Sequence, residues 1–204
     1  ETENVAGVIL WKWKEGSPKA APGLYYAKIL AGKDSLEQPF TVLANPTYKI
    51  TQQDYEDRFN TLISIRDKFT EIQKAIKTIR DVRAQINDFA DRQGKDLPKE
   101  IKIKGDTINK QLTAIEETLY QTKAKSGQDV LNYPIRLNDK ISALFGYAAS
   151  GYSAPTQQVK QAYTDLDMLA DVQLKKLQIL MDKDVLELNK LIRDKGVPVI
   201  APKK

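Results

Sequence analysis

The chain has 204 residues, of which 41% are hydrophobic and 29% are charged, and its net charge is +5. It contains no cysteine and no histidine, which excludes disulfides, thiol chemistry, histidine-based catalysis and the usual zinc sites. Its apolar runs are too short for a membrane span, and the alternation of basic and acidic residues, as in residues 80–83, indicates solvated helix faces rather than a nucleic-acid-binding surface.

Residues 1–46 are predicted to form a three-stranded antiparallel β segment. In the first strand, apolar residues alternate with the others, and two further runs rich in Tyr, Ile, Val and Phe follow, separated by Gly and Pro. The three predicted strands are 9–13, 24–31 and 40–43. Three strands are too few for a free-standing β-sandwich, which needs about seven. We therefore expect the segment to lean on the helices or to complete a β-domain, such as an immunoglobulin-like one, whose earlier strands lie upstream.

Residues 51–196 are predicted to form a helical bundle, organised around a helix over 51–92 that contains no Pro and no Gly. Two apolar series with seven-residue spacing run along this helix, which is typical of a helix packed lengthwise on others. The two series are Ile65, Ile72, Ile79 and Ile86, and Leu62, Phe69 and Ile76. At the start of the helix, Thr51 and Asp54 are spaced as in a capping box.

Three further helices follow in the pattern, over 99–126, from Pro134 to about residue 145, and over 156–194, with Ser153 or Ala154 as the cap of the last. Short connections predict an elongated antiparallel bundle of three to four long helices, so the fold class is mainly α with a small β part. The third helix either continues the second or folds back beside it. Residues 197–204 are predicted to be an extended tail.

Two features of the helices have alternative interpretations. Arg83 interrupts the apolar series, either because its stem packs flat with its head in solvent or because it forms a buried ion pair that fixes the register. The carboxylate pairs Glu116/Glu117 and Asp165/Asp167 are the residue type used in glycoside hydrolysis, but on a bundle we expect them to be solvated. We predict no catalytic, cofactor-binding or metal-binding residue.

The candidate interaction residues are the aromatic side chains Trp11, Trp13 and Tyr25 in the β segment. The two indoles would lie on one face of a strand, where they either pack against a helix or a neighbouring domain, or stack on sugar rings.

A resemblance to a known family rests on several stretches of the sequence. In the β part they are 7–11, 21–25 and 38–42, and in the helical part 62–67, 79–85, 112–117, 121–129, 131–140, 154–156 and 195–198. The run from Gln121 to Lys140 is the most specific of them. These stretches resemble the C-terminal region, the end of an immunoglobulin-like module and a helical tail, of bacterial Asp-box (BNR) or sortilin-like β-propeller proteins that are often labelled glycosyl hydrolases.

The resemblance implies a non-catalytic C-terminal structural or interaction module of a larger protein that is periplasmic or extracellular. Its partners would be the upstream propeller and immunoglobulin-like domains of the same polypeptide, together with a protein or glycan partner. No propeller repeat or Asp-box is present in this sequence, so the hydrolase label is not carried over to any residue. The alternatives are a carbohydrate-binding module that uses the aromatic residues of the β segment and, more remotely, a carboxylate-based hydrolase.

Overall fold

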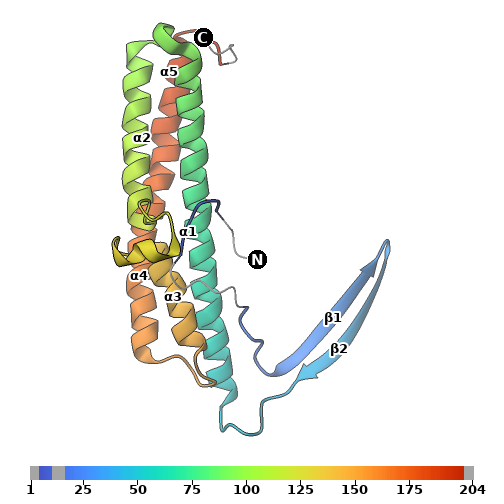
Figure 1. The fold of residues 1–204 in the computed structure, drawn as a ribbon. Helices are drawn as coiled ribbons and strands as arrows, with labels where there is room; N and C mark the ends of the chain where they lie inside the picture. The colour runs from blue at the N-terminus through green and yellow to red at the C-terminus, as the bar shows by residue number, and fades with distance from the viewer. Residues whose placement is uncertain (1–4, 11–16, 200–204) are drawn as a thin grey trace.

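Three helical rods run antiparallel along one another in the computed structural model, which describes residues 5–10 and 17–199 (Figure 1). The first rod is α1 (Gln52–Gln93), and the second consists of α2 (Lys99–Leu119) and α3 (Leu137–Ala149). The third rod is α4 (Gln157–Ile179), a π-helical segment (Leu180–Val185) and α5 (Leu186–Asp194). The predicted mainly helical class and antiparallel bundle are therefore confirmed. None of the helices in the described ranges is both long enough and apolar enough to cross a membrane.

The predicted apolar series of α1 forms the core. Six of its seven members, from Leu62 to Ile79, are at most 2% exposed, and only Ile86 is half-buried. The helix begins as predicted, because Thr51 Oγ1 accepts a hydrogen bond from the Asp54 backbone N–H at 3.1 Å while the Asp54 carboxylate accepts one from the Thr51 N–H. The apolar side chains at seven-residue spacing thus form a continuous buried contact between α1 and the other two rods.

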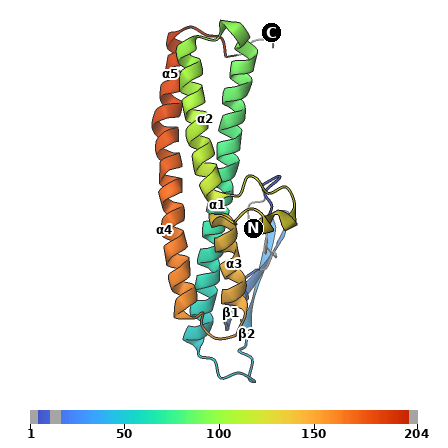
Figure 2. The same cartoon turned by 60° about the vertical axis from the view of Figure 1, so that its left-hand side comes forward.

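The second rod is broken, and this settles the position of the third helix. α3 continues below α2 in the same direction, and residues 120–136 leave the bundle between them (Figure 2). The prediction that the second helix extends to residue 126 was wrong, because the chain turns extended at Tyr120. The Gln121 side-chain amide donates to the Pro134 carbonyl at 2.8 Å and closes the base of the excursion. Consequently α3 begins after Pro134, at Leu137, and not in the same turn as that proline.

The third rod buries one apolar face along its length. Its side chains on this face, from Val159 to Leu191, are buried or half-buried against the core. The cap of α4 is Thr156, whose hydroxyl accepts from the Val159 N–H at 3.3 Å, rather than Ser153 or Ala154. Beyond the helix, residues 197–199 cross back to α1, where the Gln93 side-chain amide donates to the Pro198 carbonyl at 2.8 Å. The remainder of the predicted tail lies outside the described residues.

The β part differs from the prediction. The described residues contain a two-stranded antiparallel sheet, β1 (Gly23–Ala31) and β2 (Asp34–Val42), rather than three strands. Gly32 has φ +63° and allows a two-residue turn, so the chain pairs from Asp34 onward, and the predicted strand over 40–43 is the end of β2. Of the predicted first strand, Leu10 packs against the core and the Ile9 N–H donates to the Tyr120 hydroxyl, and residues 11–13 lie outside the described residues.

Candidate interaction sites

The β-hairpin, residues 23–42, extends away from the bundle, and within the described residues its two strands contact no other helix or strand (Figure 1). Its apolar side chains are exposed on both faces. Because strand residues alternate between faces, one face carries Ile29 and Leu36, at 65% and 67% exposure, and the other carries Leu24, Tyr26 and Leu30. Both edges of this sheet lack a further strand among the described residues. Open edges and exposed apolar faces are the features with which a sheet recruits another strand or sheet.

Of the predicted aromatic residues, only Tyr25 is described; Trp11 and Trp13 lie outside the described residues. The Tyr25 ring stacks against the Phe40 ring directly across the hairpin, with centroids 6.0 Å apart. Its hydroxyl donates to the Ala21 carbonyl at 2.7 Å. Tyr25 therefore secures the base of the hairpin and is half-buried, while the exposed aromatic ring of the opposite face is that of Tyr26.

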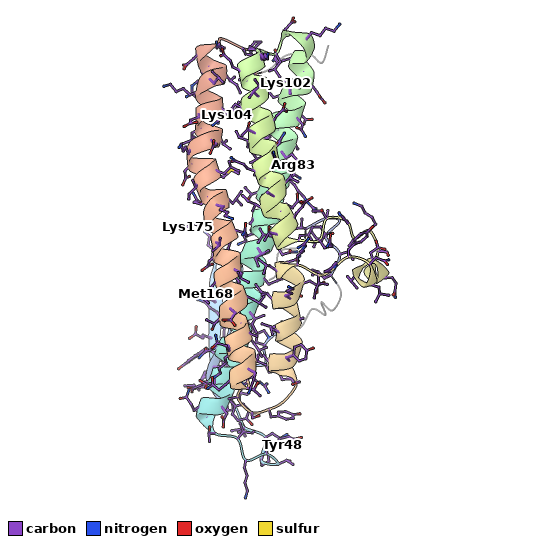
Figure 3. All side chains as sticks on the ribbon, turned by 90° about the vertical axis from the view of Figure 1, so that its left-hand side faces the viewer. Tyr48, Arg83, Lys102, Lys104, Met168 and Lys175 are labelled. Carbon is purple, nitrogen blue, oxygen red and sulfur yellow. The ribbon has the colours of Figure 1, made fainter. Side chains whose placement is uncertain are left out.

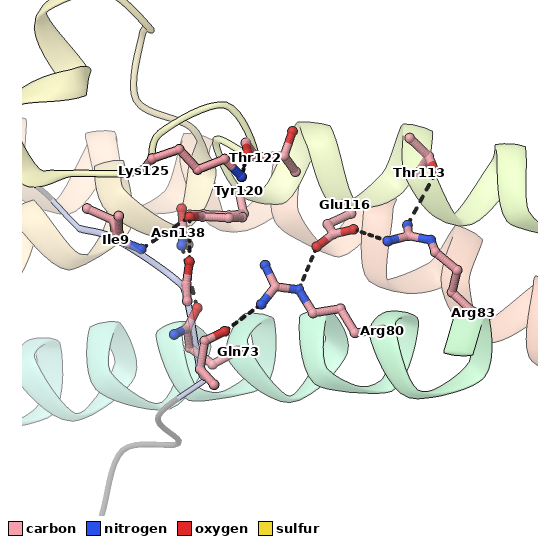
Figure 4. A network of polar contacts seen from close by, with 12 residues as sticks. Ile9, Gln73, Arg80, Arg83, Thr113, Glu116, Tyr120, Thr122, Lys125 and Asn138 are labelled. Atoms are coloured by element: carbon pink, nitrogen blue, oxygen red, sulfur yellow. Dashed lines mark hydrogen bonds and ion pairs between the residues drawn. The ribbon is translucent and has the colours of Figure 1, made fainter. Parts of the chain in front are cut away.

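A buried carboxylate joins the first two rods near the break in the second. Glu116 on α2 is 4% exposed, so the prediction that it is solvated was wrong. One carboxylate oxygen lies 2.8 Å from Arg80 Nε and the other lies 2.7 Å from Arg83 Nη1, both on α1 (Figure 4). Of the two interpretations of Arg83, the ion pair is the one that the structure shows. The signal was in the sequence, because Glu116 falls between Leu112, Ile115 and Leu119 on the apolar face of its helix.

The same cluster holds the N-terminal segment, residues 5–10, against the middle of the bundle. Arg80 Nη1 donates to the Ala6 carbonyl at 2.7 Å. The Tyr120 hydroxyl donates to the Gly7 carbonyl at 3.0 Å and accepts from the Ile9 N–H at 3.2 Å (Figure 4). We call Arg80, Arg83, Glu116 and Tyr120 the polar anchor. It satisfies backbone groups of a segment that has no regular secondary structure, while Val5, Val8 and Leu10 pack against the apolar core.

A second charged cluster joins the first and third rods around Lys68. Its Nζ atom lies 2.5 Å from the carboxylate of Asp171, 2.9 Å from that of Glu71 and 3.2 Å from that of Asp167. Burial lowers the pKa of Lys68, but the three hydrogen bonds outweigh burial and raise the pKa above its ordinary value. Burial, together with the negative charge of Asp167, raises the pKa of Tyr163 to about 12. Asp167 therefore belongs to an interhelical ion-pair cluster, whereas Asp165 is exposed.

A groove of about 550 Å³ lies between α1, α2 and α5. Its walls are mainly apolar and include Ile86, Phe89 and Leu188, and the carboxylates along it are Asp88 and Asp106. The carboxylate pairs singled out in the sequence do not line this groove. Sequence reasoning missed the groove because it assigned Ile86 to a fully buried seam. Within the described residues no group of three carboxylates is placed to hold a metal ion.

Comparisons with protein families, curated proteins and solved structures gave no match for this chain.

Proposed function

We propose that this chain is a non-catalytic structural and interaction module, in which the helical bundle is a brace and the β-hairpin engages a β-rich domain of the same polypeptide. The observation that carries the proposal is the exposure of large apolar side chains on both faces of the hairpin. An isolated two-stranded hairpin is at best marginally stable in water. A hairpin of this composition gains stability when a further strand or sheet covers it.

The polar anchor supports the role of a brace. A segment without regular secondary structure is fixed to two helices through three backbone hydrogen bonds and a buried ion-pair cluster. Residues that precede it in a longer polypeptide would therefore leave the bundle from a defined point near its middle. The hairpin is tied to the start of α1 as well, because the Gln52 side-chain amide donates to the Pro22 carbonyl at 2.9 Å.

We propose further that the larger protein is a secreted bacterial protein with an upstream β-propeller and an immunoglobulin-like module, which the hairpin completes. This part rests on the resemblance of the stretches 7–11, 21–25 and 38–42 and of the helical stretches, most specifically 121–140, to such proteins. It agrees with a hairpin that exposes both of its edges. A coding sequence that places no β-rich segment before residue 1 would overturn it.

The test is hydrogen exchange on the chain alone and on a longer polypeptide that includes the preceding sequence. If the hairpin completes a sheet, the outward-facing amides of β1 or β2 become protected in the longer polypeptide, because they then donate to a neighbouring strand. The core amides of α1 serve as the internal reference, since their protection comes from the bundle. Equal exchange of the hairpin in the two polypeptides contradicts the proposal.

Paired variants separate apolar docking from a general effect of mutating the hairpin. Ile29 and Leu36 face each other across the strands, as do Lys28 and Glu37 on the opposite face. We expect the double variant Ile29→Asp/Leu36→Asp to abolish the added protection in the longer polypeptide. The matched double variant Lys28→Gln/Glu37→Gln should retain it. Loss in both variants, or in neither, argues against docking through the apolar face.

A further inference from the structure

The outer side of the third rod is apolar where an amphipathic helix is normally polar. α4 and α5 bury Ala170, Leu177 and Leu188 against the other rods. The opposite side carries four exposed apolar residues: Met168 (56% exposed), Val172 (51%), Ile179 (54%) and Leu186 (59%). A bundle helix that serves only its own core needs a single apolar face, so this second face calls for a partner of its own.

The residues of the second face have the spacing of a helix–helix seam. Positions 168, 172, 175, 179, 182 and 186 follow one another at alternating intervals of four and three. Such spacing keeps side chains along one line of an α-helix, and from Met168 to Ile179 this line is about 17 Å long. Positions 182 and 186 lie within and just after the π-helical segment, Leu180–Val185. Met168 and Lys175 lie along this side of α4 in Figure 3. We call these six positions the outer seam; its only charged members are Lys175 and Asp182.

We propose that the outer seam is the contact between two copies of this chain, packed antiparallel about a two-fold axis between Gln178 and Ile179. This symmetry places Lys175 of each copy opposite Asp182 of the other, and it does so twice. A parallel pairing would instead place each of these charges opposite its own kind, which is destabilising. The arrangement also brings Val172 near Leu186 of the second copy. Charge complementarity thus selects both the occupant and its direction.

The two charges are available for this contact. Within the described residues Lys175 makes no ion pair, and Asp182 accepts one hydrogen bond, from the Gln178 side-chain amide in its own helix. The outer seam is distinct from the hairpin and from the polar anchor, so self-association goes beyond the bracing role. A seam of one helix per copy is smaller than a standard interface of about 1,600 Å², and we therefore expect weak association.

The test is sedimentation equilibrium of the whole chain from about 10 μM to about 1 mM, the range in which small interfaces associate. We expect a reversible monomer–dimer equilibrium. Lys175→Asp and Asp182→Lys should each raise the dimer dissociation constant by about tenfold or more, because each places like charges opposite one another. The double variant Lys175→Asp/Asp182→Lys restores the complementary pairs and should recover dimerisation. A chain that remains monomeric at all these concentrations overturns the proposal. So does a dimer whose dissociation constant is unchanged by the charge reversals.

A second pair of variants tests whether the contact lies on this face. Ile179→Asp should abolish the dimer, whereas Ile103→Asp, at a similarly exposed position on α2, should leave it intact. Circular dichroism confirms that both variants fold. Loss of the dimer with Ile103→Asp alone overturns the assignment to the outer seam.

The direction of the helices can be read by disulfide formation, since the chain has no cysteine of its own. In the antiparallel dimer Ile179→Cys lies on the outer seam next to the two-fold axis and should crosslink to its counterpart. Gln161→Cys lies far from the axis and should not. Efficient crosslinking at both positions indicates a parallel pairing and overturns the proposed geometry.

Discussion

Ile72 in the bundle and Ile29 in the hairpin are the same residue type, but their side chains differ in burial. Ile72 is completely buried between helices, whereas Ile29 is 65% exposed at the surface of a two-stranded sheet. In the bundle the seam of α1 meets apolar faces of the other two rods within the same chain. The hairpin has two apolar faces and no second layer among the described residues. The comparison suggests that the bundle is stable by itself and that the hairpin is built for a partner.

The largest effect that tests this contrast is truncation of the seam. We expect Ile72→Ala or Ile79→Ala to lower the free energy of unfolding by about 2–5 kcal/mol, because each leaves a cavity in a fully buried site. The matched substitution Ile29→Ala should change it by less than about 0.5 kcal/mol. Denaturant unfolding followed by circular dichroism measures both. Equal losses at the two sites would show that the hairpin is part of the cooperative unit.

The next effect comes from the polar anchor, which has no counterpart in the hairpin. Glu116→Gln removes the charge that Arg80 and Arg83 share, and we expect it to destabilise the chain by about 1–3 kcal/mol. We expect a smaller loss of stability than for a fully buried ion pair, because the two arginine side chains are 31% and 26% exposed. The neighbouring exposed residue provides the control, since Glu117→Gln should change stability by less than about 0.5 kcal/mol.

The same variant separates an anchor from a merely local ion pair. If Arg80 holds residues 5–10 through the cluster, amide exchange of Ile9, whose N–H donates to Tyr120, should accelerate in Glu116→Gln. It should be unchanged in Glu117→Gln. Unchanged exchange of Ile9 in both variants would separate the ion-pair cluster from the N-terminal segment.

How far the sequence predicted this molecule depends on whether the determining contact is local. The seam from Leu62 to Ile79 and the cap at Thr51 were predictable, because periodicity and capping are properties of one helix. The end of α2 was not, because Lys125, Ser126 and Gly127 form a strong local stop signal. The true end depends on Tyr120, whose hydroxyl bonds a backbone carbonyl more than a hundred residues away.

The candidate sites also depend on contacts between distant parts of the chain, which the sequence pattern predicts less well than contacts within one helix. The ion pair at Arg83 was one of two open interpretations, since its partner lies on another helix. The burial of Glu116 was missed, although its place on the apolar face of α2 was visible. The hairpin strands were located only roughly, because a two-residue turn at Gly32 extends the pairing over residues that carry few β-formers. Exposure of the hairpin depends on what surrounds it, which the pattern of one strand does not contain.

A smaller effect is expected at the N-terminal cap of α1, where the bundle meets the hairpin. Thr51→Ala removes the side chain that accepts from the Asp54 N–H, and such a loss typically destabilises a protein by about 1 kcal/mol. Hydrogen bonds from Thr51 lower the pKa of Asp54. The contribution of that carboxylate is therefore present at neutral pH and is lost as the pH falls below its unfolded value, near 3.8. The difference in stability between Thr51→Ala and the unsubstituted chain should thus shrink at low pH, where the Thr51 hydroxyl no longer donates to a charged carboxylate, but the part due to the Asp54 N–H bond should remain. Thermal unfolding between pH 7 and pH 2 measures this.

The smallest effect is spectroscopic and compares a tyrosine of the bundle with those elsewhere in the chain. Burial and the negative charge of Asp167 raise the pKa of Tyr163 to about 12, so the folded state favours the neutral phenol. The resulting stability is fully present below the unfolded pKa near 10 and is lost as the pH rises toward 12. Titration of phenolate absorbance should therefore contain a late component that Tyr163→Phe removes, while Tyr26→Phe, on the exposed face of the hairpin, leaves it in place. If Tyr163→Phe removes only a component that titrates near pH 10, the phenol is not held by the Lys68 cluster, and the first and third rods separate more readily than the structure indicates.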